Sequence, residues 1–452
     1  MDEEKFALVE KILKDVDNVM LKNAECAFDI VPVESNIQNK SPVLHLENCL
    51  GLESWCVKHV YMYCYSELMD KYLSKTNRRI VKPSSINSER LTRLLNVTLL
   101  INPDVSSLWN KRREMTLKSL FQKANELQFT KLVLSRKPKC NDAFSYRRWL
   151  LDLMFKDILI KGNDSVQVNF IESLVNEDLN VCELASDKTP NNYHSWNHRI
   201  WLLQTLKNMR KEFDINLLYT KEYGFSEKWT SKHVSDFSCF HYRQFCIKNL
   251  FTVDDENLNN LESSLNISLH KNFIRLVTQN YINDISVPMS EEKLLSYTDE
   301  DIINLILGCA VKNCNCTKNN CALVSRKFEI LFHELVLNSE FMRFYKYHET
   351  LWYHRRFIVH EIITLIYDHF DLVRQNGVLV KKNCRKCNTE EIKEKPHKVV
   401  RYDSNRIYSS ILFNVLLNHE KKFVEERRND KDNYADRHEK YMKFVEGLNN
   451  VL

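Results

Sequence analysis

A short aromatic–arginine pattern occurs five times along the chain, and this recurrence limits the possible folds more than any other feature. Each copy has an aromatic residue, any residue, then Lys, Tyr or His, and then arginine. The aromatic and arginine of each copy are Trp109 and Arg112, Phe144 and Arg147, Trp196 and Arg199, Phe240 and Arg243, and Trp352 and Arg355. The first two copies begin 35 residues apart (109 to 144), about one helix–turn–helix unit. The later intervals of 52, 44 and 112 residues (144 to 196, 196 to 240, 240 to 352) indicate inserts.

The spacing within each copy has a simple physical meaning. An aromatic residue at position i and an arginine at i+3 lie on one face of a helix. The ring fills the space between paired helices, and the guanidinium reaches a carboxylate or a helix C-terminus in the neighbouring repeat. Stacked helix pairs of this kind bury a continuous core and form a curved solenoid. Repeat packing alone is a sufficient explanation for each of these aromatic and arginine side chains.

The composition agrees with an all-α chain. Among 452 residues there are only 6 glycines and 8 prolines, which favours long helices over sandwiches, barrels or open sheets. No two glycines lie close together, so the glycine-rich phosphate loops of P-loop and dinucleotide-binding folds are excluded. Hydrophobic residues make up 44% of the chain, enough for a sizeable core.

Charge and cysteine content indicate a cytoplasmic protein. The 65 Lys and Arg residues nearly balance 60 Asp and Glu residues, for a net charge of +5, so no nucleic-acid partner is expected. The charged start at residues 1–5 is followed by no apolar segment of the kind found in signal peptides. No apolar stretch approaches the roughly 20 residues of a membrane span, so no integral membrane contact is expected. The 14 cysteines are then expected to be reduced, mostly as small buried side chains.

Four segments follow from the helical patterns and breakers. Residues 1–87 are predicted to form N-terminal helices that cap the solenoid, including a long helix over about 46–72 after a looser stretch at 28–41. Residues 88–375 contain the repeats, with an insert at about 252–340. Residues 376–402 are predicted to form a basic loop. Residues 403–452 are predicted to form C-terminal capping helices.

The repeated motif resembles the α-subunit repeat of protein prenyltransferases over about 88–358. The third copy is a near-literal match, since residues 191–199 read Asn-Asn-Tyr-His-Ser-Trp-Asn-His-Arg. Residues 46–58 and 347–352 are most similar to one branch of these proteins, the α-subunit repeat-containing branch that forms a type-three geranylgeranyltransferase.

This resemblance implies a fold and an activity. The fold is a right-handed superhelix, a crescent of antiparallel helix pairs around a β subunit, here that of the Rab-type geranylgeranyltransferase. The β subunit holds the zinc and most of the isoprenoid tunnel, so this chain is expected to bind no cofactor or metal itself. Geranylgeranyl diphosphate lies at the subunit interface. Its geranylgeranyl group moves to a cysteine of a prenyl-acceptor protein, including a SNARE.

The same resemblance implies four site residues. In the second repeat, the family's diphosphate-binding lysine corresponds to Lys139, which enters a helix after Pro138, where the positive helix N-terminus suits an anion. The family's tyrosine two residues later is replaced by Asn141, so a phenol role there is lost. The third repeat keeps the Asn-Tyr-His set, as Asn192, Tyr193 and His194, which are expected to bind substrate near the rim of the active site. Without the resemblance, Lys139 reads as a solvated turn lysine and the other three as interface packing and capping.

Two other functions stay open. One is a non-catalytic helical-repeat scaffold for protein–protein interaction, which the departure at Asn141 allows. The other is an adaptor stabilised by a structural zinc ion, held by cysteines at 309, 314, 316, 321, 384 and 387. The irregular spacing of these cysteines favours free thiols in an insert. The basic run at 381–386 reads as a solvated loop.

Overall fold

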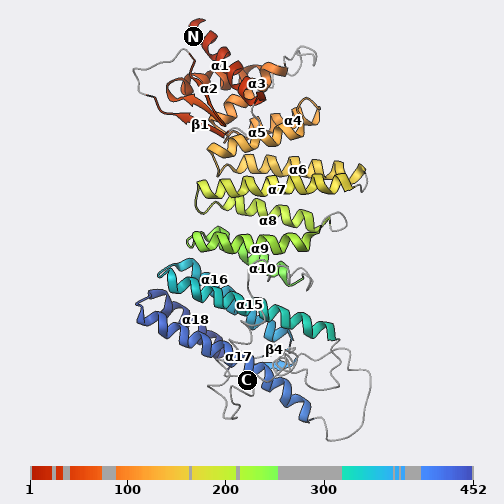
Figure 1. Ribbon diagram of the computed structural model, residues 1–452, viewed down its shortest axis with the longest axis vertical. Coiled ribbons are helices and arrows are strands. Elements are labelled where there is room, and N and C mark those ends of the chain that lie inside the picture. Colours follow the sequence, from red (N-terminus) through yellow and green to blue (C-terminus); the bar gives the residue numbers. More distant parts are fainter. Residues whose placement is uncertain are drawn as a thin grey trace. The chain divides into compact units, whose positions relative to one another are not determined.

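The computed structural model describes residues 3–22, 27–33, 41–73, 88–161, 165–209, 214–252, 318–369, 372–375, 378–381 and 399–449. The chain divides into two compact units, Met1–Ile215 and Asn216–Leu452. Helices arranged as successive antiparallel pairs make up most of the described residues in each unit (Figure 1). The predicted all-α helical repeat fold is therefore confirmed.

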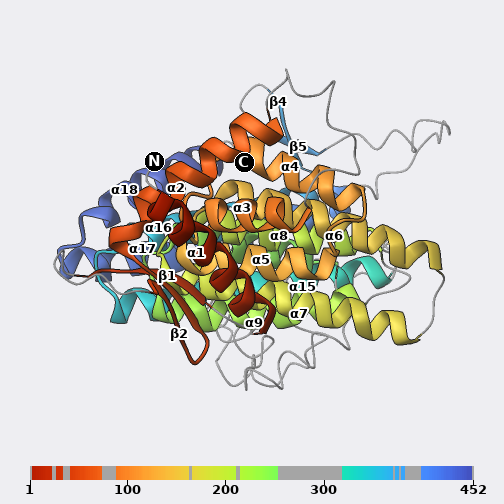
Figure 2. The ribbon, with the colours of Figure 1, turned by 90° about the horizontal axis from the view of Figure 1, so that it is seen from above.

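The first part of unit 1 differs from the prediction. It contains three helices and a π-helical turn: α1 (Glu3–Lys22), α2 (Ser54–Glu67), η1 (Leu68–Leu73) and α3 (Ser88–Ile101). It also contains a three-stranded sheet of order β1-β3-β2, made of β1 (Ala27–Val31), β2 (Val43–Leu46) and β3 (Cys49–Glu53). Strand β1 is parallel to β3, and β2 is antiparallel to it. The sheet packs beside α1 and α5 (Figure 2).

The expectation of helices alone over 1–87, with one helix starting near residue 46, is therefore wrong. Residues 43–53 form strands, and the helix begins only at Ser54. Gly51 lies in β3 where a larger residue would not fit: a Cβ atom there would lie 2.9 Å from Val31 Cγ2 and 3.3 Å from Leu44 Cβ. Glycine at this position lets the neighbouring strands approach closely. These contacts are tertiary, so the local hydrophobic pattern did not reveal them.

The repeats of unit 1 occupy the helices α4 (Ser106–Leu117), α5 (Lys123–Arg136), α6 (Asn141–Lys161), α7 (Ser165–Lys188) and α8 (Tyr193–Lys207). Helix α5 pairs with α6, α7 pairs with α8, and α6 lies beside α8. The leading aromatic residues Trp109, Phe144 and Trp196 are all buried. The Trp109 ring packs against Tyr146 at a centroid distance of 5.2 Å. The aromatic positions thus fill the space between helices, as the motif predicts.

Unit 2 contains the helices α9 (Ile215–Lys232), α10 (Phe237–Leu250), α15 (Lys318–Phe344), α16 (Glu349–His369), α17 (Val399–Asn429) and α18 (Asn433–Asn449), and the short strands β4 (Leu372–Gln375) and β5 (Val378–Lys381). Helices α15 and α16 form one pair, and α17 and α18 form another. The leading aromatics Phe240 and Trp352 belong to one buried cluster with Phe423. Helix α15 lies at the end of the range 252–340, where an insert was expected, and β5 lies in the expected loop at 376–402. Residues 399–402 of that expected loop belong to α17, and the other residues of the two segments, 253–317, 376–377 and 382–398, lie outside the described residues.

The motif arginines bind carboxylates on the first helix of the following pair. Arg112 donates to both oxygens of Glu126 at 2.7 and 2.6 Å. Arg355 donates to both oxygens of Glu420 at 2.8 and 2.7 Å. The same relation joins Arg147 to Asp178 and Arg243 to Glu334. The prediction that each guanidinium reaches a carboxylate of the next repeat therefore holds for these four copies.

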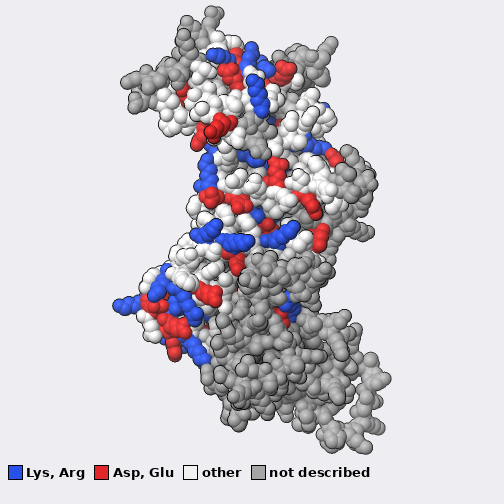
Figure 3. Space-filling model, viewed as in Figure 1, with Lys and Arg blue, Asp and Glu red and all other residues white. Residues whose placement is uncertain are grey.

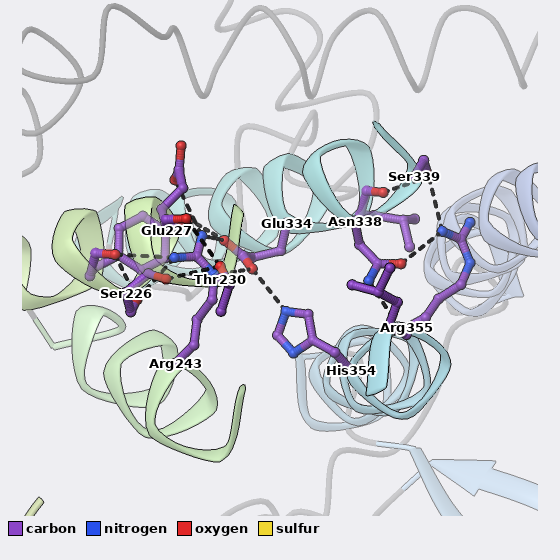
Figure 4. A network of polar contacts seen from close by, with 12 residues as sticks. Ser226, Glu227, Thr230, Arg243, Glu334, Asn338, Ser339, His354 and Arg355 are labelled. Atoms are coloured by element: carbon purple, nitrogen blue, oxygen red, sulfur yellow. Dashed lines mark hydrogen bonds and ion pairs between the residues drawn. The ribbon is translucent and has the colours of Figure 1, made fainter. Parts of the chain in front are cut away.

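The third position of the motif binds the same carboxylate from the other side. Figure 4 shows this for Glu334, which accepts from Arg243 (2.5 Å) and from His354 Nε2 (3.1 Å). Tyr146 binds Glu126, and His198 binds Asp178. Each carboxylate thus joins the arginine of one copy to the third residue of the next.

A sixth, partial copy closes this series. Glu420, the partner of Arg355, also contacts His438 Nε2 at 2.7 Å. His438 stands where the third motif residue belongs, but Asp436 and Glu439 replace the aromatic and the arginine. The sequence pattern missed this copy because both of its defining residues are absent.

Candidate functional site

The four predicted site residues lie together in unit 1, at the edge where α6 and α8 begin (Figure 1). Lys139 lies in the turn before α6. Asn192 is the N-cap of α8, and Tyr193 and His194 are its first two residues. The structure therefore brings together residues that are separated by about fifty positions in the chain.

Two hydrogen bonds tie the turns before α6 and α8 to each other. The Lys139 ammonium donates to the carbonyl oxygen of Pro190 at 3.1 Å. In the opposite direction, the Asn192 amide donates to the carbonyl oxygen of Pro138 at 2.7 Å. These reciprocal bonds hold the two helix starts in register.

Asn192 is a buried structural anchor of this edge. Its Nδ2 also donates to the carbonyl oxygen of Ala185 at 3.0 Å, and its Oδ1 accepts from Ser195 N at 3.3 Å. Its relative exposure is 0%, so both polar ends of the amide are used inside the chain. The preceding Asn191 has a φ of 54°, a left-handed conformation that asparagine tolerates well. Asn192 therefore positions its neighbours.

Tyr193 and His194 face outward from this anchored turn. Tyr193 is 60% exposed. Its ring lies edge-on to the His194 imidazole, with centroids 5.8 Å apart and planes at 76°. A tyrosine with one apolar face and a free polar end suits a contact surface for another molecule.

Arg148 is a residue of this edge that the motif analysis did not single out. It is half-buried on α6, two turns after Asn141. Within the described part of the chain, it makes no hydrogen bond, ion pair or ring contact. Of its equivalents, Arg113 donates to Asn110 at 2.8 Å, whereas Arg356 lies over the Tyr353 ring at 5.3 Å and its Nε has no hydrogen-bond partner among the described residues. The signal available in the sequence was a second arginine directly after the motif arginine.

The electrostatics confirm that Arg148 belongs to the same neighbourhood. Burial lowers the pKa of the His194 imidazole, and the positive charges of Arg148 and Lys139 lower it further. Burial also lowers the pKa of the Arg148 guanidinium. Because the influence of a charge falls with distance, the three side chains form one basic edge. His194 is neutral at pH 7 there and can act as a hydrogen-bond donor or acceptor.

Metal and membrane features can be assessed only for the described residues. Within these ranges, no group of three or more His, Cys, Asp or Glu side chains is placed to hold a metal ion. The cysteines at 309, 314, 316, 384 and 387 lie outside them, as does the side chain at 321. No described helix is long and apolar enough to cross a bilayer. Basic and acidic side chains are interspersed over the described part of the face in Figure 3.

The chain matches the family model "Protein prenyltransferase alpha subunit repeat" at residues 124–154, 175–206 and 219–250. The first two segments contain all the residues of the basic edge. The human protein prenyltransferase alpha subunit repeat-containing protein 1 is 30% identical over 365 residues, covering 79% of this chain and 78% of the relative. The Xenopus laevis protein 1-B is 29% identical over 80% of this chain and 75% of its own. The geranylgeranyl transferase type-2 subunit alpha of Candida albicans is 27% identical, over 44% of this chain and 41% of that protein. The chain therefore belongs to the family of protein prenyltransferase alpha subunit repeat-containing proteins.

Proposed function

We propose that this chain is the α subunit of a cytoplasmic, heterodimeric protein geranylgeranyltransferase that is active only with a β subunit. The complex transfers a geranylgeranyl group from its diphosphate to a cysteine of an acceptor protein such as a SNARE. The observation that carries this proposal is the basic edge at the starts of α6 and α8, where Lys139, Tyr193 and His194 are anchored by Asn192.

The chemistry of prenyl transfer explains why a basic edge is useful. The thiolate of the acceptor attacks C1 of the isoprenoid, the C1–O bond breaks, and the diphosphate leaves with its negative charge. Fixed cations stabilise the charge that develops on the leaving group. A lysine ammonium has three donors, and Lys139 uses one for Pro190, so the other two can bind diphosphate oxygens. Zinc held by the β subunit would lower the pKa of the acceptor cysteine and so favour its thiolate form.

The other site residues have supporting roles in this proposal. Asn192 holds the turn, while Tyr193 and His194 form the rim against which the isoprenoid diphosphate and the acceptor protein lie. The similarity to the geranylgeranyl transferase type-2 subunit alpha of Candida albicans supports geranylgeranyl transfer by a complex of subunits, and in this proposal the partner is a Rab-type β subunit.

Co-expression with a Rab-type β subunit tests the proposal. The purified complex is incubated with labelled geranylgeranyl diphosphate and acceptor proteins ending in cysteine motifs. We expect transfer by the complex and none by either subunit alone. Lys139→Ala is expected to lower transfer at least about tenfold without preventing assembly. The matched control is Lys123→Ala, a lysine of the same unit that pairs with Asp157, and its rate should stay unchanged.

The outcomes separate the possible functions. If no complex forms, the α-subunit proposal fails. If a complex forms but transfers no isoprenoid to any acceptor, the chain is a scaffold that kept the fold. The cysteines at 309–321 and 384–387 are assigned to free thiols, and metal analysis of the purified chain tests this against a zinc-stabilised adaptor.

A further inference from the structure

We infer that Arg148 is a second cation for the isoprenoid diphosphate, binding the same anion as Lys139 from the side of α6. This inference rests on the proposed function and extends it to a residue outside the Lys139 and Asn-Tyr-His positions.

The first argument is that the charge of Arg148 has no partner among the residues that the structure describes. A half-buried guanidinium without a partner loses part of its hydration and gains nothing in return. Motif arginines such as Arg147 and Arg243 bind carboxylates. Asp152, one turn further along α6, is not within ion-pair distance of Arg148 in the described structure. An anion from outside the chain is the missing partner.

The second argument is that the repeat itself does not need this charge. In the third and fourth copies, the residue directly after the motif arginine is Ile200 and Gln244. In the first copy, Arg113 has a partner in Asn110 and lies over the Tyr146 ring at 5.4 Å. Packing of the repeat therefore explains Arg113 and leaves Arg148 unexplained.

The third argument is position. Arg148 lies seven residues after Asn141, about 10 Å along the helix. Helical side chains lean toward the N-terminus of their helix, so the long Arg148 side chain is directed back toward the basic edge. After burial, the charges of Arg148 and Lys139 both lower the pKa of the His194 imidazole, so both cations lie near His194. Lys139 lies in the turn before α6, and Arg148 lies two turns into that helix.

The chemistry of the two cations is complementary. A lysine ammonium acts as a compact point charge for one oxygen, whereas a planar guanidinium donates two parallel N–H groups to two oxygens of a phosphate. A diphosphate presents several such oxygens on two phosphorus atoms. The neutral His194 between the cations adds a hydrogen bond and no repulsion.

The test uses the αβ complex with Arg148→Met, which keeps the apolar stem of the side chain and removes the charge. We expect the KM for geranylgeranyl diphosphate and the inhibition constant of inorganic diphosphate each to rise about tenfold, because charged hydrogen bonds are lost. The KM for the acceptor protein should stay within about twofold. Arg113→Met, the equivalent position of the preceding repeat, is the control and should leave all three constants unchanged. If Arg148→Met does not assemble, Arg148→Gln carries the same test.

Unchanged diphosphate constants would overturn the inference, as would a rise confined to the KM of the acceptor, which would assign Arg148 to acceptor carboxylates. In both cases the proposed function stands. A wild-type complex that binds geranylgeranyl diphosphate through Arg148 but transfers nothing would support the inference and overturn the function. Failure of the complex to form would overturn both.

Discussion

The buried motif arginines show why other residue types cannot take their positions in this repeat. A planar guanidinium can donate two parallel N–H groups to one carboxylate and a third N–H elsewhere. Arg355 does this with Glu420 and with the Ser339 hydroxyl at 2.9 Å, and Arg243 does it with Glu334 and the Ser226 hydroxyl at 3.0 Å (Figure 4). Lysine, with one nitrogen, cannot replace either set.

Breaking one such pair is expected to be strongly destabilising. Glu420→Gln leaves the fully buried Arg355 without its counter-charge and should lower the free energy of unfolding by about 3–5 kcal/mol. The measurement is denaturant unfolding of the purified protein. The control is Arg428→Ala, an exposed residue that pairs with Asp436, where the loss should be much smaller because water screens an exposed ion pair. Equal effects of the two substitutions would contradict the role given to the buried pairs.

Stability should fall as the pH is lowered, in two stages. Burial lowers the pKa of His198. Below about pH 6.5 this histidine therefore binds a proton in the unfolded chain but not in the folded chain, which lowers stability. Burial also opposes ionisation of Asp178, but the charges of Arg147 and His198 outweigh it and lower its pKa to about 2. Its contribution, on the order of 2 kcal/mol, is complete above about pH 4 and is lost as the pH falls toward 2.

Denaturant unfolding at a series of pH values between 8 and 3 measures this dependence. Asp178→Asn should remove the part of the slope below about pH 4 and leave the part near pH 6.5, where His198 and other buried histidines titrate. A free energy of unfolding that stays constant down to pH 4 would exclude buried neutral histidines in the folded state.

At the scale of helices and turns, the cap residue of α8 makes more hydrogen bonds than helix capping alone requires. Asn192 caps the helix and also binds the turn before α6. Asp236 caps α10 in the ordinary way, through Ser238 N and Cys239 N. Asn192 therefore combines local capping with a connection between repeats.

We expect Asn192→Ala to lower the free energy of unfolding by about 2–3 kcal/mol, since it removes a cap and leaves the buried carbonyl of Pro138 without its donor. Asp236→Ala should cost about 1 kcal/mol. In the complex, Asn192→Ala should also lower prenyl transfer, because Lys139 depends on the same turn. Loss of stability with a normal transfer rate would show that the turn does not position the site.

At the scale of the whole molecule, shared carboxylates link each described repeat of a unit to the next. In unit 2 the series ends on α18, where the His438 ring lies tilted against the Trp352 ring, with centroids 5.2 Å apart, and binds Glu420. Trp352 also donates its indole N–H to Asp432 at 3.0 Å. The partial sixth copy therefore completes the burial of the fifth.

Removal of residues 433–452 is expected to destabilise unit 2 by several kcal/mol, because Trp352, Arg355 and Glu420 lose their cover and part of their hydrogen bonding. Circular dichroism during thermal unfolding measures the effect. Removal of residues 450–452 alone serves as the control and should change little. If the longer truncation melts at the same temperature as the full chain, α18 is not part of the cooperative unit.

The sequence by itself determined the repeat helices and named the four residues proposed for the site. The spacing of aromatic and arginine residues is a local property of one helix face, so Trp109, Phe144 and Trp352 could be assigned to the core without coordinates. The four site residues could likewise be named from the motif that they share with a family.

Only the tertiary structure decided which distant residues meet. No local sequence pattern identifies Glu334 and Glu420 as ion-pair partners, because the arginine that each binds lies 91 or 65 residues away in the chain. The strands at 43–53 form by pairing with each other and with β1, a relation between segments. Arg148 became notable only when its surroundings showed an unmatched charge. Partners, close approaches and missing partners are relations between segments, and a linear pattern records only what lies within one segment.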